Sequence, residues 1–366
     1  MRINVTRSSM PPMEEYLEEI RPLWETRWLT NNGPKAAALK DGLEDYLPCA
    51  HAELFSNGHL ALEALLRAMK LQGEVITTPF TFASTTHALV RCGLSPVFAD
   101  VRPDCTLDPD AVEQLITDKT CAILPVHVYG SLCDTDRFDE ISRKHGIPVI
   151  YDAAHAFGVR RNGVSAAAMG YASMFSFHAT KVFHTIEGGC ITIRDEALCE
   201  KLRMERNFGI AGEESTPEVG GNAKMNEFQA AMGLCSLRHI DDDIDDRRRV
   251  VETYRQLLAD CPAVRFLSPQ PGVRSNYAYL PAFFAAKAMR DQVYESLKAQ
   301  DIYARKYFYP LVTDFECYQG RPGFDSSLTP VAAQLADTVL TLPLYPGLSD
   351  EDIRRICAIV RDNAHE

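Results

Sequence analysis

Three segments of the chain carry residues whose types and positions could do chemistry: a lysine, an aspartate and a glycine. Lys181 follows a strand-like run, and a lysine at the end of a buried strand is costly unless it has a partner or a reaction to perform. Asp152 ends the apolar run 149–151, where its carboxylate could face a protonated ring nitrogen. Gly58 precedes leucines at helical spacing, and free backbone N–H groups at a helix start can bind an anion.

Each of these three signals has an ordinary structural alternative. A surface lysine, a carboxylate that caps a turn and a glycine in a common helix cap would look the same in the sequence. Their order and combination favour pyridoxal 5′-phosphate (PLP), which needs a lysine for the Schiff base, a carboxylate at the pyridine nitrogen and an anion site. The chain has neither Gly-x-Gly-x-x-Gly nor Gly-x-x-x-x-Gly-Lys-Ser/Thr, which argues against a dinucleotide or P-loop site.

Cysteine and histidine spacing predicts neither a disulfide framework nor a metal site. The 11 cysteines are scattered without a Cys-x-x-Cys pair, so we expect buried thiols in a reducing cytoplasm. The 10 histidines include no His-x-x-x-His or His-Glu-x-x-His spacing, and we expect no bound metal.

The elements that must position these residues alternate between strand and helix. Strands are expected near 75–76, 96–99, 121–128 and 149–152, and helices over 82–92, 109–116 and 135–145. This alternation predicts a mostly parallel, doubly wound α/β sheet with helices on both faces. Ligands bind beyond the carboxyl ends of such strands, which selects Asp152, His155 and the loop after Thr77.

A long helix and a second, smaller domain are expected downstream. Apolar residues spaced by three and four from Met225 to about Ala259 predict the helix, and its charge run 241–249 should be a solvated face. Strand-like pieces follow at 264–267, 277–284 and 302–308, with helices near 289–299 and after a Ser349–Asp352 capping pattern. We expect a large PLP-binding α/β domain at 1–245 and a small α+β domain at 246–366.

Composition and charge limit the partners. The net charge of −12 makes a nucleic-acid or anionic-membrane surface unexpected. No segment approaches the roughly 18 to 20 apolar residues that a bilayer demands, and no export signal is visible. We therefore expect a cytoplasmic protein with no nucleic-acid or membrane partner.

The same residues resemble the DegT/DnrJ/EryC1/StrS family of sugar-nucleotide aminotransferases, which have PLP fold type I. Residues 176–181 read Ser-Phe-His-Ala-Thr-Lys and are similar to the family's Ser-Phe-His-x-x-Lys signature. This resemblance implies that Lys181 is the Schiff-base and catalytic lysine and that Ser176 is a phosphate ligand. Residues 152–155 resemble the family's Asp-x-Ala-Gln/His element, which implies that Asp152 pairs with the pyridinium and His155 lies near the phenolic oxygen of the ring.

Three further stretches resemble cofactor-binding elements of the family. In 57–62, similar to Ser-Gly-Thr-Ala-Ala-Leu, His59 replaces threonine, so Gly58 and His59 are expected to contact the phosphate through the backbone. The stretch 79–84 resembles one whose aromatic residue stacks on the cofactor, which assigns that role to Phe82. The stretch 221–227 is similar to an element that reaches across a dimer, implying a homodimer with shared active sites in which Asn222 contacts the partner's phosphate.

The resemblance implies transfer of an amino group from L-glutamate to a nucleotide-linked keto-sugar. Within the family, 28–34 and 55–63 are most similar to enzymes that convert dTDP-4-keto-6-deoxyglucose into dTDP-4-amino-4,6-dideoxyglucose. Where many relatives have histidine, this chain has Phe208 and Val312, in regions near the family's sugar site. The alternatives are a C3-aminating transaminase, a PLP-dependent sugar dehydratase and a non-catalytic PLP-binding regulator. Lys181 argues against the dehydratase, because dehydratases that resemble this family carry histidine in place of the lysine.

Overall fold

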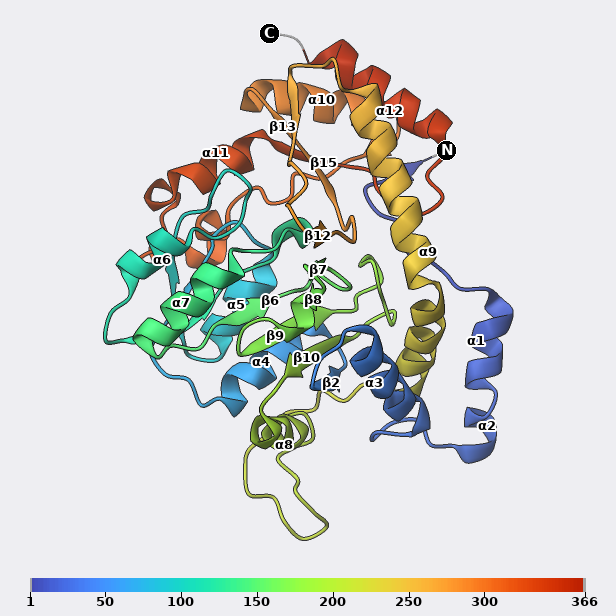
Figure 1. Ribbon diagram of the computed structural model, residues 1–366, viewed down its shortest axis with the longest axis vertical. Coiled ribbons are helices and arrows are strands. Elements are labelled where there is room, and N and C mark those ends of the chain that lie inside the picture. The colour runs from blue at the N-terminus through green and yellow to red at the C-terminus, as the bar shows by residue number, and fades with distance from the viewer. Residues whose placement is uncertain (1, 365–366) are drawn as a thin grey trace.

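The computed structural model describes residues 2–364 and shows a central, mostly parallel sheet with helices on both sides (Figure 1). One group of strands has the order β4-β3-β5 and the other β2-β10-β9-β6, and parallel bridges Ile123–Val149 and Val126–Asp152 join them. The pairings among these strands are parallel except the two that β10 makes. Their bounds are His51–Phe55 (β2), Glu74–Thr77 (β3), Ser95–Phe98 (β4), Thr120–Leu124 (β5), Ile150–Asp152 (β6), Ala172–Ser176 (β9) and Gly189–Ile193 (β10).

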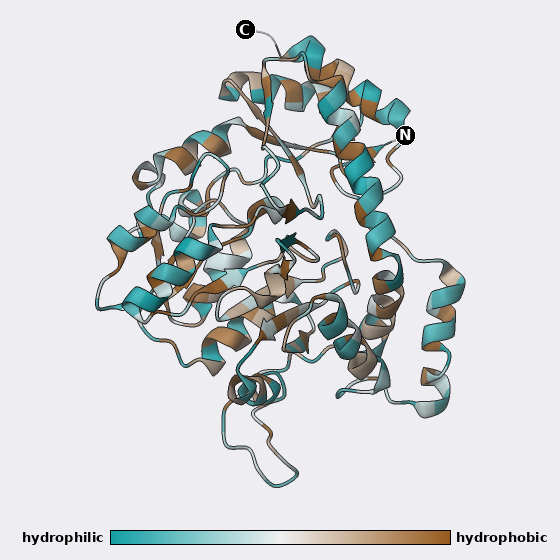
Figure 2. Cartoon of the chain, in the orientation of Figure 1, coloured by the Kyte–Doolittle hydropathy of each residue, from teal (hydrophilic) through white to brown (hydrophobic). Residues whose placement is uncertain are grey.

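Successive strand residues point to opposite faces, so the sheet has an apolar core on each side. In β3, Ile76 packs into one core and Val75 into the other, as Phe175 and Met174 do in β9. The helices that supply the first core are α3 (Pro34–Tyr46), α6 (Pro109–Leu115), α7 (Thr135–His145) and α9 (Glu227–Leu257). Those of the second are α4 (Gly58–Ala68), α5 (Ala83–Arg91) and α8 (Glu196–Glu205). Figure 2 shows hydrophilic residues concentrated on the outer sides of these helices.

The elements predicted between residues 74 and 193 are confirmed, with small shifts at their ends. Helix α7 has the expected bounds, and Gly146 ends it in the left-handed conformation (φ 67°) that glycine adopts without strain. The Asp108 side chain caps α6 by accepting from the Asp110 N–H at 3.1 Å. The strand expected at 121–128 ends early, at Leu124, although the stretch up to His127 still bonds Asp152, and the 3-10 turn η1 (Val128–Gly130) begins after it.

The long helix expected from residue 225 to about 259 is α9, which links the two parts of the molecule (Figure 1). Its N-cap is Asn226, whose side chain accepts from the Gln229 N–H while the Gln229 side chain accepts from the Asn226 N–H. The prediction that the whole charge run is solvated is wrong at Arg247. That side chain is buried and donates to the Leu344 carbonyl at 3.4 Å.

The C-terminal part is α+β, as expected. Its sheet has the order β11-β13-β15, formed by Val264–Phe266, Leu280–Phe284 and Val339–Leu342, and is antiparallel. Helices α10 (Lys287–Ala299), α11 (Pro330–Thr338) and α12 (Asp350–Asn363) cover it. Ser349 caps α12 by accepting from the Asp352 N–H, and its hydroxyl donates to the Asp352 carboxylate, so the expected helix start is confirmed.

Short elements complete the structure. They are β1 (Ile3–Asn4), which pairs with β14 (Ile302–Tyr303), the sheet β12-β7-β8 (Val273–Arg274, Arg160–Arg161 and Val164–Ser165), helices α1 (Met13–Ile20) and α2 (Leu23–Thr26), and the 3-10 turns η2 (Ala166–Ala168), η3 (Val312–Asp314), η4 (Glu316–Tyr318) and η5 (Ser326–Leu328). The domain boundary predicted at 245/246 falls within α9 and stays a prediction. No helix among residues 2–364 is apolar over enough length to cross a bilayer.

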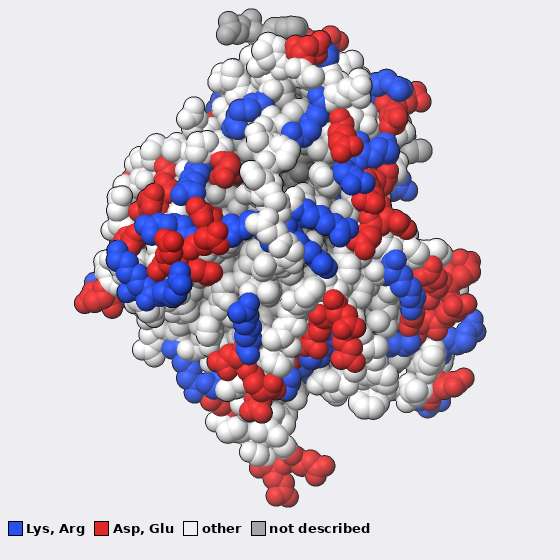
Figure 3. All heavy atoms as spheres, viewed as in Figure 1, with Lys and Arg blue, Asp and Glu red and all other residues white. Residues whose placement is uncertain are grey.

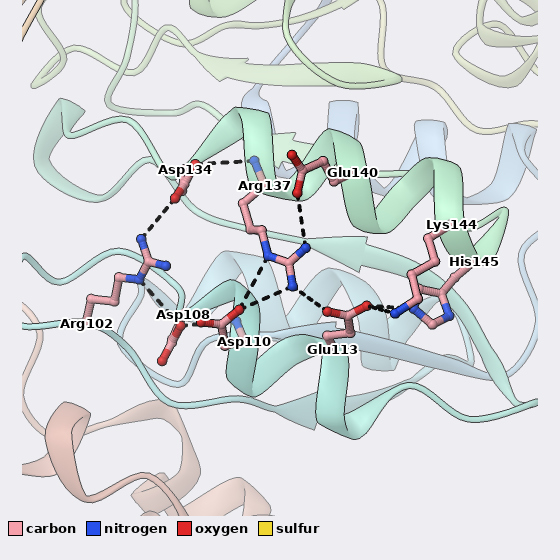
Figure 4. A network of polar contacts seen from close by, with 9 residues as sticks. All are labelled: Arg102, Asp108, Asp110, Glu113, Asp134, Arg137, Glu140, Lys144 and His145. Atoms are coloured by element: carbon pink, nitrogen blue, oxygen red, sulfur yellow. Dashed lines mark hydrogen bonds and ion pairs between the residues drawn. The ribbon is translucent and has the colours of Figure 1, made fainter.

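Charged side chains of both signs are interspersed on the face seen in Figure 3. A network of ion pairs joins helices α6 and α7 (Figure 4). In it, Glu113 contacts Arg137, Lys144 and His145 at 2.6, 2.7 and 3.1 Å. This network lies on the outer side of the sheet helices and takes no part in lining the cavity described next.

Candidate active site

A cavity of about 460 Å³ lies where strands β6 and β9 end and helices α4 and α5 begin. The structure brings most of the predicted site residues together around it: Gly58, His59, Phe82, Asp152, His155, Ser176 and Lys181. The rule that ligands bind beyond the carboxyl ends of the strands therefore located the cavity from sequence alone.

Lys181 is held in a loop that begins at the end of β9. The loop is closed at its base, because the Phe177 N–H donates to the Gly188 carbonyl at 2.8 Å and the Thr185 N–H donates back to the Phe177 carbonyl at 3.0 Å. Burial lowers the pKa of Lys181 to about 8, against the opposing effects of Asp152 and Tyr307. Its Nζ lies 5.8 Å from the centre of the Tyr279 ring. The amine is thus far easier to deprotonate at neutral pH than a surface lysine.

Asp152 ends β6 with its carboxylate buried. Oδ2 accepts from the Thr85 hydroxyl at 2.8 Å, and Oδ1 accepts from the Ala154 N–H at 3.1 Å. Burial raises the pKa of Asp152, while these two hydrogen bonds and the charge of Lys181 act in the opposite direction. A cation brought against this carboxylate would relieve the cost of its burial.

His155 lies in the same wall of the cavity with one ring nitrogen fixed. Its Nδ1 faces the backbone N–H of Tyr129 at 3.1 Å and accepts from it, which leaves the proton of the neutral imidazole on Nε2. Burial lowers the pKa of His155 well below its usual range, as does the charge of Lys181, so the ring is neutral. Its plane is parallel to that of Phe308, with ring centres 6.0 Å apart.

The start of α4 and the end of β9 form a cradle for an anion. Asn57 caps the helix by accepting from the Leu60 N–H at 2.8 Å, and the preceding backbone N–H groups belong to Gly58 and His59. A Cβ on Gly58 would lie 3.0 Å from that of Ser176, so glycine permits this close approach. Gly189 is equally constrained, since a Cβ there would lie 2.6 Å from the backbone of Asn57 and Gly58.

The groups that line this cavity fit PLP. The helix start and the Ser176 hydroxyl suit its phosphate, the buried carboxylate suits its pyridinium and the buried amine suits its aldehyde. Phe82, at the cavity rim just before α5, is 60% exposed and available to cover a ring. Within residues 2–364, no group of three histidine, cysteine or acidic side chains is arranged to hold a metal ion.

Asn222 is the predicted site residue that does not line this cavity. It is exposed in the segment between α8 and α9, from which a long loop projects away from the body (Figure 1), and its Oδ1 accepts from Lys224 at 2.9 Å. Phe208 and Val312, which replace histidines of the family, also lie outside the cavity lining. Phe208 is exposed beneath the Lys224 ammonium, and Val312 is buried.

Several residues of the site were not expected from the sequence. Thr85 looks like an ordinary helical residue, and the backbone of Tyr129 reaches His155 only because η1 follows β5. Tyr279, Tyr307 and Phe308 come from the C-terminal part of the chain. The spacing of none of these residues carries a signal, since their contacts arise from tertiary packing.

The profile of the DegT/DnrJ/EryC1/StrS aminotransferase family matches residues 12–361. The chain is 39% identical over 363 residues to dTDP-4-amino-4,6-dideoxy-D-glucose transaminase of Shigella dysenteriae, covering 98% of both proteins. It is 33% identical over 346 residues to GDP-perosamine synthase of Caulobacter vibrioides, covering 91% of each.

Solved structures share the fold over nearly the whole chain. DesI, solved in the presence of its TDP-sugar product, superposes with a TM-score of 0.94 at 36% identity, covering 99% of this chain and 93% of DesI. The Helicobacter pylori aminotransferase PseC, involved in pseudaminic acid biosynthesis, superposes with a TM-score of 0.93 at 25% identity, covering 99% of each chain. The fold-type-I α/β architecture predicted from the sequence is confirmed.

Proposed function

Because the chain belongs to the DegT/DnrJ/EryC1/StrS aminotransferase family, we propose that it binds PLP and transfers an amino group to a nucleotide-linked keto-sugar. We propose L-glutamate as the donor, dTDP-4-keto-6-deoxyglucose as the acceptor and dTDP-4-amino-4,6-dideoxyglucose as the product. The enzyme is an aminotransferase. The substrate proposal draws on the 39% identity to transaminases named for that product, and the cofactor proposal on the buried Lys181 and Asp152 in one cavity.

Bound PLP would act as an electron sink for the carbon that carries the amino group. Lys181 would hold it through Nζ and, once released, move a proton with that same atom. A pKa of about 8 suits this work, since a group that must both accept and donate a proton performs best near the working pH. Asp152 would keep the ring nitrogen protonated, and the neutral His155 would donate from Nε2 to the phenolic oxygen.

The remaining site residues would bind and orient the cofactor. The N–H groups of Gly58 and His59 and the hydroxyl of Ser176 would bind its phosphate, and Phe82 would cover one face of its ring. Each of these roles uses a group that already faces the cavity. None requires Phe208 or Val312, so the two departures from the family bear on the sugar site and leave the cofactor roles intact.

We also propose a homodimer with shared active sites. In support, Asn222 lies outside the cavity of its own chain, and apolar side chains near it and near α2 are exposed: Trp24, Trp28, Phe208, Ile210 and Val219. Mixing Lys181→Ala chains with Asn222→Asp chains should produce activity that neither variant has alone. Each mixed dimer then has one site with both native residues. No gain on mixing would contradict a shared site.

Borohydride reduction of the PLP-loaded protein tests the cofactor proposal. Peptide mapping should find the reduced adduct on Lys181, and the visible absorption should be absent in Lys181→Ala. In a separate, unreduced sample of the wild-type protein, glutamate should bleach the visible band. A nucleotide keto-sugar that is a substrate should restore the band, and a panel of such sugars can be screened. Locating the new amine by NMR distinguishes C4 from C3 amination. A protein that binds PLP but does not complete the half-reaction with glutamate would contradict the proposed activity.

A further inference from the structure

The backbone of His59 lies at the phosphate cradle, whereas its side chain contacts Ser84 and Glu63. Its N–H belongs to the first turn of α4, beside the phosphate cradle. Its ring has a protein group beside each nitrogen: Nδ1 is hydrogen-bonded to the Ser84 hydroxyl at 2.8 Å, and Nε2 lies 3.1 Å from a Glu63 carboxylate oxygen. With both nitrogens occupied by protein groups, the ring is not directed at an anion in the cavity.

Glu63 lies where it influences which nitrogen of His59 carries the proton. Its side chain is 6% exposed, and it also pairs with Arg91 and, at 3.7 Å, with Arg67. A carboxylate beside Nε2 favours the tautomer of His59 that carries its proton on that nitrogen. In the neutral ring, Nδ1 is then an acceptor, and the Ser84 O–H donates to it. The buried Glu63 carboxylate thus favours Ser84 as the donor in its hydrogen bond to His59.

Ser84 lies in the first turn of α5, between two residues of the cofactor site. Phe82 is the N-cap of that helix and makes no side-chain capping bond, and the Thr81 and Thr85 hydroxyls bond each other at 2.9 Å across the same turn. Thr85 follows Ser84, and its hydroxyl bonds Asp152 at 2.8 Å. The Ser84–His59 bond is a side-chain contact that ties the turn carrying Phe82 and Thr85 to the helix that carries the phosphate cradle, while Arg91 pairs with Glu63 at the other end of α5.

On the basis of the PLP function proposed above, we infer that the His59 side chain is a positioning residue, which holds the first turn of α5 through Ser84 and so sets Thr85 against Asp152. The backbone of His59 would bind the phosphate, and its ring would act, through Ser84 and Thr85, on the opposite end of the cofactor. A threonine at position 59 would be too short to reach both Ser84 and Glu63 from α4, whereas the histidine ring reaches both.

Pyridoxal, which lacks the phosphate, separates this role from a direct phosphate contact. For full-length apoprotein, the dissociation constants of PLP and of pyridoxal should rise by the same factor in His59→Ala, about five-fold, the effect of one hydrogen bond. Ser84→Ala should show the same equal loss. The double variant should be no weaker than either single one, because both changes break the same bond. His59→Asn, whose amide oxygen occupies the place of Nδ1, should recover most of the affinity.

The control is His145→Asn, which removes a histidine of the α6–α7 network far from the cavity and should leave both constants unchanged. A loss confined to PLP would show that the His59 ring contacts the phosphate and would overturn the inference. Additive losses in the double variant, or no loss in His59→Ala, would overturn it as well. If the wild-type protein forms no visible-absorbing adduct with PLP, the proposed function fails instead.

Discussion

Thr85 and Asp152 join α5 to β6 through a single hydrogen bond, in which the Thr85 hydroxyl donates to Oδ2 at 2.8 Å. The other carboxylate oxygen accepts from the backbone of Ala154. Each oxygen therefore has one partner, and lone pairs remain for a group in the cavity. The bond orients the carboxylate and helps keep it charged against the effect of its burial, which raises its pKa.

Thr85→Val should remove this bond while keeping the shape of the side chain. The pKa of Asp152 should rise further, because one of the groups that lower it is lost. We expect the half-reaction with glutamate to slow by about ten-fold, the effect of a hydrogen bond to a charged group. Stopped-flow absorbance measures this rate. Thr85→Ser, which keeps the hydroxyl, should restore it, and a Val variant as fast as wild type would contradict the role.

Asp152→Asn should have a larger effect than Thr85→Val. The amide has nearly the same size but cannot hold a protonated ring nitrogen with a full negative charge, and breaking a buried charge pair costs about 3–5 kcal/mol. We expect the rate of the glutamate half-reaction to fall by roughly 10² to 10³-fold. Borohydride labelling of Lys181 should persist, which separates this defect from loss of the cofactor. A decrease of less than about three-fold would mean that the carboxylate does not face the ring.

The pKa of Lys181 predicts how the apoprotein captures PLP. Only the neutral amine is a nucleophile, and burial lowers the pKa of this lysine to about 8. The attachment rate should rise with pH and level off above a midpoint near 8, while model lysines would still be rising at pH 10. Rapid-mixing absorbance at a series of pH values measures the midpoint. A rate that continues to rise to pH 10 would show that Lys181 is not deprotonated as its burial requires.

The sequence predicted the parts of this site that belong to regular elements. The strand-end rule selected Asp152, while Lys181 was singled out as a lysine after a strand-like run and Gly58 as a helix start, and all three line one cavity. The groups that hold them could not be found in this way. Thr85 and the Tyr129 N–H make their bonds across distances of 67 and 26 residues, and such contacts are set by packing rather than by local periodicity.

The N-terminal helices were also not predicted. Residues 13–46 form α1, α2 and α3, but few of their side chains reach a core, since α1 buries none and α3 buries three. Their placement depends on long-range bonds instead, such as Glu227 of α9 accepting from the backbone of Lys35 and Ala36 at the start of α3. A carboxylate that caps a helix almost 200 residues away leaves no pattern in either segment.

Gly189→Ala should damage the phosphate cradle. The added Cβ would lie 2.6 Å from the backbone of Asn57 and Gly58, so β10 and the start of α4 must separate. We expect a loss of about 1–3 kcal/mol in the free energy of unfolding and weaker binding of PLP. Pyridoxal, without the phosphate, should be affected less than PLP. Gly212→Ala is the matched control, since its Cβ would meet no atom within 4 Å, and it should change neither quantity.

Glu113 should make the α6–α7 network (Figure 4) a source of pH-dependent stability. Hydrogen bonds from Lys144 and His145 lower its pKa to about 2, below the ordinary value of about 4.3. The folded state therefore binds fewer protons than the unfolded state between these values, so the stabilisation is complete above pH 4.3 and is lost as the pH falls towards 2.

In urea unfolding, Glu113→Gln should lower the midpoint at pH 7, and the difference from wild type should shrink at pH 4 and again at pH 3. Glu140→Gln, which loses a single ion pair to Arg137, should have a smaller effect. A Glu113→Gln difference that stays constant from pH 7 to pH 3 would show that the carboxylate acts through packing rather than through its charge.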